Sequence, residues 1–293
     1  MKKNIFTGSA TALITPFYDQ KIDFDSLGRI IDIQLESETD ALVISGTTGE
    51  SATLSEEEKK ALFAFAAERV GGKIPVIAGT GTNDTALSLR LSRTAEQVGC
   101  DALLVVTPYY NKPSPNGLYE HYSRVADSTS LPLIAYNVPS RTGVNIPVSV
   151  VERLSASGAI AALKEASGDL SRIASIISAC PDLTVYSGND DQILPIMSLG
   201  GQGVISVLSN ILPKETHRMC AECLDGNFGS AKKLQLHYLK LIGLLFSEVN
   251  PIPVKYIMSK LGLCRPEYRL PITDPTESTR QLLDKAIIDY GLR

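Results

Sequence analysis

The chain has 293 residues, of which 44% are hydrophobic and 20% charged, with a formal net charge of -4. This composition is typical of a globular protein and excludes disorder as a description of the whole chain. The slightly acidic balance provides no broad positive field for phosphates, so nucleic acids and anionic membranes are unsuitable partners and a small molecule is the expected one.

Short apolar, β-branched runs alternate along the chain with longer stretches of helical periodicity. This alternation is typical of parallel strands joined by helices. The runs predict eight strands, at residues 9–15, 41–45, 74–78, 101–106, 132–137, 160–164, 183–187 and 203–207.

Several of the intervening helices have recognisable starts. Ser55 is expected to cap the helix EEEKKALFAFAAERV, whose first turn holds three glutamates where the helix dipole favours anions. Other starts are predicted at Asn83 or Asp84, at Pro147 as a first helical residue, at Asp169 and at Pro213.

Eight strand and helix pairs with continuous apolar strands predict an α/β fold, the closed (β/α)8 TIM barrel. The alternative, an open doubly wound sheet, lacks support because no glycine fingerprint follows the first strand and no Walker loop occurs. We expect the barrel over residues 1–225 and a C-terminal helical extension over 226–293. The extension is predicted to hold helices at 228–248, 251–261 and 276–290 and, without a flexible linker, to pack on the barrel.

Cysteine number and apolar run lengths indicate the compartment. Five scattered cysteines predict free thiols in a reducing environment. No run reaches the roughly 18 apolar residues of a membrane-spanning helix, and the N-terminal pattern reads as a strand rather than a signal peptide. The expected location is cytoplasmic. The cysteines are Cys100, Cys180, Cys220, Cys223 and Cys264.

In such a barrel the reactive groups lie where the strands end. GTTGES (46–51) follows the second strand and places Thr47 and Thr48 in a glycine-flanked turn. Hydroxyls and backbone amides in this turn could bind an anion such as a carboxylate, or the segment could be an ordinary surface turn.

The fifth strand ends in YNVPSRTG (136–143), which supplies the phenol of Tyr136 and the guanidinium of Arg141. A strand-end tyrosine could exchange a proton, and an arginine pairs with a carboxylate through two hydrogen bonds. The alternatives are a packed aromatic side chain and a solvated loop arginine.

Lys164 is the most informative residue, because it ends the apolar sixth strand, where a cation gains nothing from burial. Desolvation lowers the pKa of a lysine, and the resulting neutral amine can attack a ketone and form a Schiff base. The adjacent Glu165 points to the opposite face of the strand and is therefore not its natural partner. The alternative is a lysine whose ammonium reaches solvent.

Two other groups of residues carry weaker signals. His217, Cys220 and Cys223 have a spacing that suggests metal ligands, but no second pair completes a zinc site, so no metal is expected. Tyr109 and Tyr110 lie in a proline-bounded loop after the fourth strand, where aromatic residues serve an interface or a site.

The chain closely resembles the dihydrodipicolinate synthase family of class I pyruvate-dependent aldolases. The resemblance rests on motifs that occur in this order after successive strands, namely GTTGES, TPYYNKPS, YNVPSRTG, LKEASGD and GVISV, together with NPIPVK (250–255). The resemblance covers nearly the whole chain. It implies a (β/α)8 barrel lyase that condenses pyruvate with L-aspartate 4-semialdehyde towards diaminopimelate and lysine. It implies no metal and no organic cofactor.

The same resemblance implies individual roles. Lys164 forms the imine with pyruvate, and Tyr136, Thr47 and Tyr110 form a hydroxyl relay in which Tyr136 is the general acid/base. Tyr110 reaches in from a neighbouring subunit, so the assembly is at least a homodimer and by resemblance a homotetramer. Positions matching substrate-binding sites are Thr48, Arg141, the backbone at Ile205, and Gly188.

Inhibited members of the family bind L-lysine at a dimer interface. Here Leu87 stands where a carboxylate would pair with the inhibitor, and Lys59 places a cation where those members have histidine, so we expect weak or absent feedback. The aligned positions are Ser51, Ala52, Glu56, Lys59, Asn83, Leu87 and Tyr109.

Two competing functions stay open. One is a related aldolase, such as N-acetylneuraminate lyase or a 2-keto-3-deoxy sugar acid aldolase, which would share the lysine and the tyrosine. Arg141 argues against it, since those relatives generally lack an arginine in that loop. The other is a barrel retained as a binding or regulatory protein without turnover.

Overall fold

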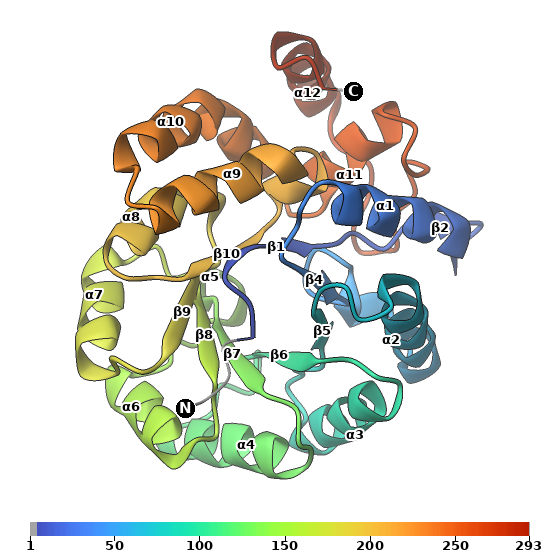
Figure 1. Cartoon of the computed structure of the whole chain (residues 1–293). Helices are drawn as coiled ribbons and strands as arrows, with labels where there is room; N and C mark the ends of the chain where they lie inside the picture. Colours follow the sequence, from blue (N-terminus) through green and yellow to red (C-terminus); the bar gives the residue numbers. More distant parts are fainter. Residues whose placement is uncertain (1–4, 293) are drawn as a thin grey trace.

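The computed structural model describes residues 5–292, in which eight parallel strands close into a barrel (Figure 1). The first strand pairs with both the second and the last barrel strand, which closes the sheet and confirms the predicted (β/α)8 fold. The barrel strands are β1 (Gly8–Ala12), β4 (Ala41–Ile44), β5 (Val76–Gly79), β6 (Ala102–Val106), β7 (Leu133–Asn137), β8 (Ala162–Glu165), β9 (Thr184–Ser187) and β10 (Gly203–Ser206).

Each barrel strand is followed by a helix on the outside of the barrel. Ser55 and Glu58 form a reciprocal capping box at one helix start, and Asp84 rather than Asn83 caps the next. Pro147 precedes its helix instead of beginning it, because its ψ of 144° is extended. The helices are α1 (Phe24–Glu36), α2 (Glu56–Val70), α3 (Thr85–Gln97), α4 (Pro115–Asp127), α6 (Val148–Ser157), α7 (Leu170–Ala179), α8 (Ile193–Ser198) and α9 (Pro213–Leu224).

Six short elements were not predicted, because each is shorter than the period that a sequence pattern needs. Two of them form a hairpin whose turn holds Asp19 and Gln20, both with positive φ. They are β2 (Phe17–Tyr18), β3 (Lys21–Ile22), α5 (Pro139–Thr142) and the 3-10 turns η1 (Ser51–Thr53), η2 (Asp190–Gln192) and η3 (Leu208–Asn210).

Alternation along the strands separates two apolar layers. On β8, Ala162 belongs to the cluster inside the barrel, whereas Leu163 belongs to the cluster between the strands and the helices. Lys164 therefore points inward and Glu165 outward. Glu165 pairs with Arg172 of α7 at 3.2 Å, which confirms that it is not the partner of Lys164.

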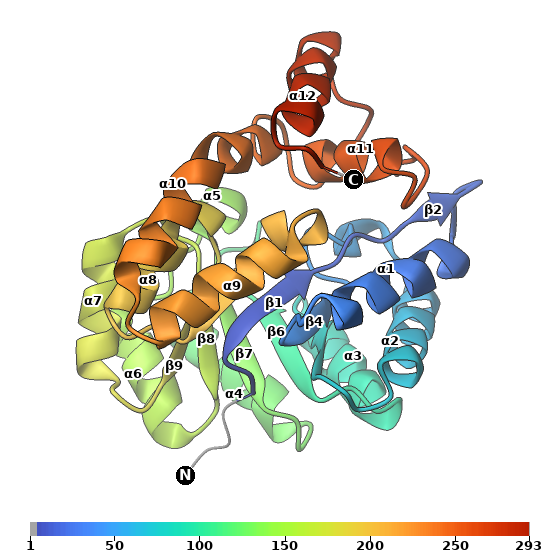
Figure 2. The same cartoon turned by 45° about the horizontal axis from the view of Figure 1, so that its top comes forward.

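Three further helices follow the barrel: α10 (Phe228–Leu245), α11 (Ile252–Lys260) and α12 (Glu277–Asp289). Helix α10 packs against α8 and α9, and α11 contacts α12 and η3 (Figure 2). The division into residues 1–225 and 226–293 stays a prediction. Within the described part of the chain, no helix combines the length and apolarity that crossing a membrane requires.

Candidate active site

The carboxyl-terminal ends of the barrel strands open onto two adjoining cavities of about 450 and 130 Å³. Thr47, Tyr136, Arg141 and Asn250 line both of them. The smaller cavity is the one that Lys164 lines, and its other lining residues include Thr48, Ala166, Gly188 and Val207.

Lys164 occupies the inner face of β8 and is only 6% exposed. Its Nζ lies 4.3 Å from the centroid of the Tyr136 ring, and the two residues are register partners on β8 and β7. No carboxylate within the described residues forms a salt bridge with it. The structure thus places Lys164 as a buried amine on the inner face of a strand end, and its role as the nucleophile stays a prediction.

Burial lowers the pKa of Lys164 from 10.5 to about 7. The carboxylate of Asp190 acts in the opposite direction and raises this pKa, while the nearby cation Arg141 lowers it further. With a pKa near 7, about half of the lysine side chains are neutral at neutral pH. A neutral amine is the form that attacks a carbonyl carbon.

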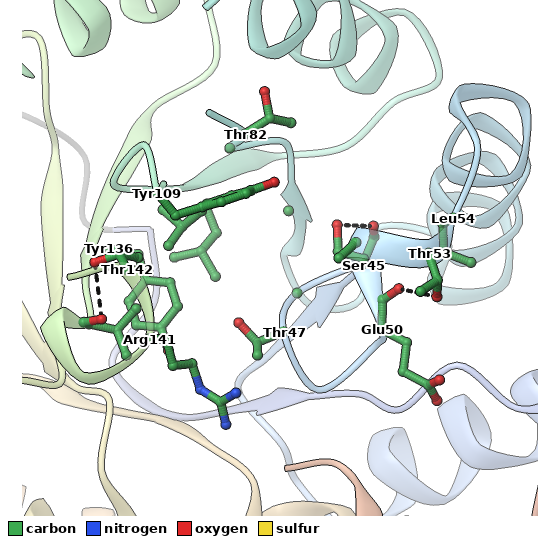
Figure 3. A pocket seen from close by; sticks show the side chains of 18 of the residues that line it. Ser45, Thr47, Glu50, Thr53, Leu54, Thr82, Tyr109, Tyr136, Arg141 and Thr142 are labelled. Carbon is green, nitrogen blue, oxygen red and sulfur yellow. Dashed lines mark hydrogen bonds between the residues drawn. The ribbon is translucent and has the colours of Figure 1, made fainter. Parts of the chain in front are cut away.

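Tyr136 and Thr47 provide the hydroxyl groups beside this amine. Burial raises the pKa of Tyr136, whereas Arg141 and a side-chain hydrogen bond with Thr47 lower it. Figure 3 shows Tyr136 and Arg141 at one end of the larger pocket, Glu50 and Leu54 at the other, and Thr47 between them. The arrangement can hold and move a proton close to the amine.

Gly188 leaves the space that the lysine side chain occupies. A Cβ atom at this position would lie 3.1 Å from the Lys164 Cε and 2.7 Å from the Ala166 Cβ. The Gly188 N–H donates to the Glu165 carbonyl at 2.8 Å, which fixes the loop against β8. A side chain here would push the reactive amine out of position.

The remaining predicted substrate positions differ in their access to the cavities. Thr48 is buried and faces the small cavity, while Arg141 is exposed and lines both cavities. Ile205 lies on β10 within the inner apolar cluster and is not a lining residue. Ile205 lines neither cavity, and the predicted contact through its backbone stays a prediction.

Tyr110 does not reach this site within a single chain. It is 90% exposed and has a φ of 70°, a conformation that bulky residues rarely adopt. Its neighbour Tyr109 lines the larger cavity. Within one chain, the Tyr110 side chain therefore lies on the surface and outside the site.

Six of the seven aligned effector positions line the larger cavity. Glu56 is the exception, because it points to the surface and pairs with Arg90 at 3.0 Å. Lys59 is buried without an ion-pair partner among the described residues, and burial lowers its pKa. The lining members are Ser51, Ala52, Lys59, Asn83, Leu87 and Tyr109.

The sequence analysis missed Asp190. It is buried in η2, and its Oδ2 accepts hydrogen bonds from the backbone N–H groups of Val207 and Leu208 at 3.0 and 2.9 Å. Its carboxylate influences the pKa of Lys164, as described above. Asp190 follows Ser187, Gly188 and Asn189, so the apolar run that marked Lys164 in the sequence is absent there.

The other candidate ligands do not assemble. His217 Nδ1 lies 2.9 Å from the Asp40 carboxylate, and Cys220 and Cys223 pack in an apolar cluster. Across residues 5–292, no three histidine, cysteine or acidic side chains gather in a way that could hold a metal ion.

Comparison with known proteins gives a consistent result. The model of the dihydrodipicolinate synthetase family matches residues 5–289. A 4-hydroxy-tetrahydrodipicolinate synthase from Acetivibrio thermocellus is 48% identical over the full length of both chains. The dihydrodipicolinate synthase from Aquifex aeolicus has 42% identity and a TM-score of 0.97, covering 98% of this chain and 99% of the other.

A second similar solved structure is a complex with pyruvate. The chloride-inhibited dihydrodipicolinate synthase from Acinetobacter baumannii, solved in complex with pyruvate, has 40% identity and a TM-score of 0.96, with 99% of this chain and 100% of the other covered. The similarity of fold and sequence thus extends over nearly the whole chain. The chain belongs to the dihydrodipicolinate synthetase family.

Proposed function

We propose that the protein is a lyase of the class I aldolase type that condenses pyruvate with L-aspartate 4-semialdehyde to form 4-hydroxy-tetrahydrodipicolinate, in the biosynthesis of lysine and diaminopimelate. The observation that carries this proposal is the buried Lys164 amine beside Tyr136. Membership of the family supplies the substrates.

The reaction starts with attack of the neutral Lys164 amine on the keto carbon of pyruvate. Loss of water gives an iminium, which withdraws electrons so that the pyruvate methyl group loses a proton and becomes an enamine. The enamine carbon then bonds to the aldehyde carbon of the semialdehyde, whose oxygen takes up a proton, and the iminium forms again. The amine of the semialdehyde attacks the iminium carbon, which closes the ring and releases the Lys164 amine. Each step needs a proton at a place that burial shields from bulk water.

Tyr136 is the proposed general acid/base, with Thr47 and a partner subunit's Tyr110 completing the proton relay. The lowering effect of Thr47 and Arg141 on the Tyr136 pKa supports this role, because it opposes the effect of burial. Arg141 would receive the carboxylate of the semialdehyde, and its exposure leaves it accessible to an entering substrate.

Thr48, Gly188 and the Ile205 backbone form the proposed pyruvate subsite. Thr48 and Gly188 line the same small cavity as Lys164, which supports their assignment. The relative from Acinetobacter baumannii was crystallised with pyruvate, the substrate that this subsite would take.

We also propose a homodimer, and by family resemblance a tetramer, in the cytoplasm. The exposure and positive φ of Tyr110 support a contact with a second chain. The cysteines of the described chain are all unpaired and buried, which fits a reducing compartment.

Feedback by L-lysine is proposed to be weak or absent. Lys59 lines the larger cavity as a buried cation, and Leu87 in the same cavity offers no carboxylate to the inhibitor's amine. A bound lysine would therefore lose a charge partner and meet a like charge.

The activity test is to offer pyruvate with either L-aspartate 4-semialdehyde or N-acetylmannosamine and to follow product formation. We expect condensation with the semialdehyde only, and Arg141→Leu should raise the KM for the semialdehyde more than the KM for pyruvate. Arg153→Leu, a change in a helix facing away from the cavities, serves as the control. Reaction with the sugar, or no reaction with either acceptor, would contradict the proposal.

A further inference from the structure

The GTTGES loop is held by residues from outside the barrel. Asn250, in the segment between α10 and α11, donates from Nδ2 to the Oγ1 of Thr48 at 2.9 Å. Both residues are buried, and both line the small cavity that Lys164 also lines. The C-terminal extension therefore contributes a side chain to the cavity itself.

This hydrogen bond determines what the Thr48 hydroxyl can do. A hydroxyl has one proton to donate and two lone pairs that accept. Because the Asn250 amide NH2 can only donate, it occupies a lone pair of Thr48 and leaves the Thr48 proton for another acceptor. Thr48 is thereby prepared to donate to an anion in the small cavity, and a hydrogen bond to a charged acceptor is stronger than a neutral one.

Asn250 Oδ1 itself is buried and has no hydrogen-bond partner among the described residues. A buried acceptor without a partner reduces stability, so its presence is unusual in a native protein. Among the described residues, the Asn250 side chain therefore makes its hydrogen bond to Thr48 through Nδ2.

A second attachment fixes the other end of the same loop. Glu50 has a φ of 54°, and its Oε1 contacts the Nζ of Lys255 in α11 at 2.6 Å, with both side chains fully buried. Its Oε2 accepts from the Arg269 N–H at 3.2 Å. The Lys255 Nζ also lies 4.2 Å from the centroid of the Phe17 ring. The loop is consequently fixed both at Thr48 and, two residues later, at Glu50.

We propose that Asn250 is a positioning residue for the keto acid, acting through Thr48, which it makes a hydrogen-bond donor to the substrate's carboxylate. Lys255 supports this by fixing Glu50 at the end of the loop. The inference rests on the proposed function, since it assigns the way in which pyruvate is bound. It makes the extension a part of the substrate site.

The test is a double-mutant cycle of Asn250→Ala and Thr48→Val in the full-length protein, measured as KM for pyruvate, KM for the semialdehyde and kcat. Asn250→Ala should raise the KM for pyruvate about tenfold, equivalent to about 1.4 kcal/mol, with little change in the other two constants. The same change in the Thr48→Val background should have almost no further effect, because the residue acts through the hydroxyl.

The Asn250→Asp variant distinguishes a role of Asn250 in orienting the Thr48 hydroxyl from a role in filling space. The aspartate has the same shape, but it accepts the Thr48 proton and repels the substrate's carboxylate, so the KM for pyruvate should exceed that of Asn250→Ala. Asn227→Ala and Asn227→Asp, at the exposed N-terminal end of α10, are the matched controls and should leave KM unchanged.

Three results would overturn the inference: an unchanged KM in Asn250→Ala, equal effects of Asn250→Ala with and without the Thr48 hydroxyl, or a smaller effect of Asn250→Asp than of Asn250→Ala. Thermal melts of each variant identify any loss of folding, and the KM values are compared only among the variants that fold. Failure of the proposed function is distinct, because in that case the unmodified protein itself would not react with pyruvate.

Discussion

The rate at which pyruvate and cyanoborohydride together inactivate the protein is expected to follow the neutral fraction of Lys164. Burial lowers the pKa of this group from 10.5 to about 7. At pH 7 about half of the amine is neutral, compared with about three molecules in ten thousand for an ordinary lysine, a difference of roughly a thousandfold. The inactivation rate should therefore rise about tenfold per pH unit below pH 6 and level off above pH 8.

A substitution of Asp190 should shift the dependence of the inactivation rate on pH. Its carboxylate raises the Lys164 pKa, so Asp190→Asn should move the midpoint of the profile to lower pH. The amide oxygen can still accept from the backbone N–H groups of Val207 and Leu208, which keeps the loop in place. A profile that keeps rising to a midpoint near pH 10, or a shift to higher pH in the variant, would refute the electrostatic reasoning.

Three other predictions concern the assembly, the buried ion pair and regulation. Tyr110→Phe should lower turnover roughly a hundredfold while the imine with pyruvate still forms, and unchanged turnover would remove Tyr110 from the relay. Lys255→Met should lower the free energy of unfolding by about 3–5 kcal/mol because it leaves Glu50 buried and unpaired, and the double change with Glu50→Gln should restore most of the loss in urea titrations. Millimolar L-lysine should leave activity nearly unchanged, and halved activity at ordinary substrate levels would contradict the proposed loss of feedback.

The barrel could be predicted because its signals are local and repeated. Most strands are short apolar runs, and most long helices have a capping side chain or a proline at their start, as Ser55 and Pro213 illustrate. Helix α10 is an exception, because its N-cap residue Asn227 makes no side-chain capping hydrogen bond. The β2–β3 hairpin could not be predicted, since two-residue strands have no period. The prediction for Pro147 was displaced by one residue because proline is compatible with both the cap and the first helical position.

Lys164 could be predicted because a lysine in an apolar strand is physically unfavourable without a function. The same reasoning does not identify Asn250 or the pair of Glu50 and Lys255, because none of them lies in an apolar strand. These residues lie about two hundred positions apart from their partners along the chain, and each is polar in a segment that reads as an ordinary turn or helix. Their pairing depends on how the extension packs against the loop, which no local pattern encodes.

The most direct measurement for the whole account is to reduce the protein with borohydride in the presence of isotopically labelled pyruvate and to locate the label by peptide mass mapping. We predict one labelled peptide that carries the adduct on Lys164, and no label in Lys164→Ala protein that remains folded. Label on a different lysine, or carbon–carbon bond formation that survives Lys164→Ala, would contradict the account.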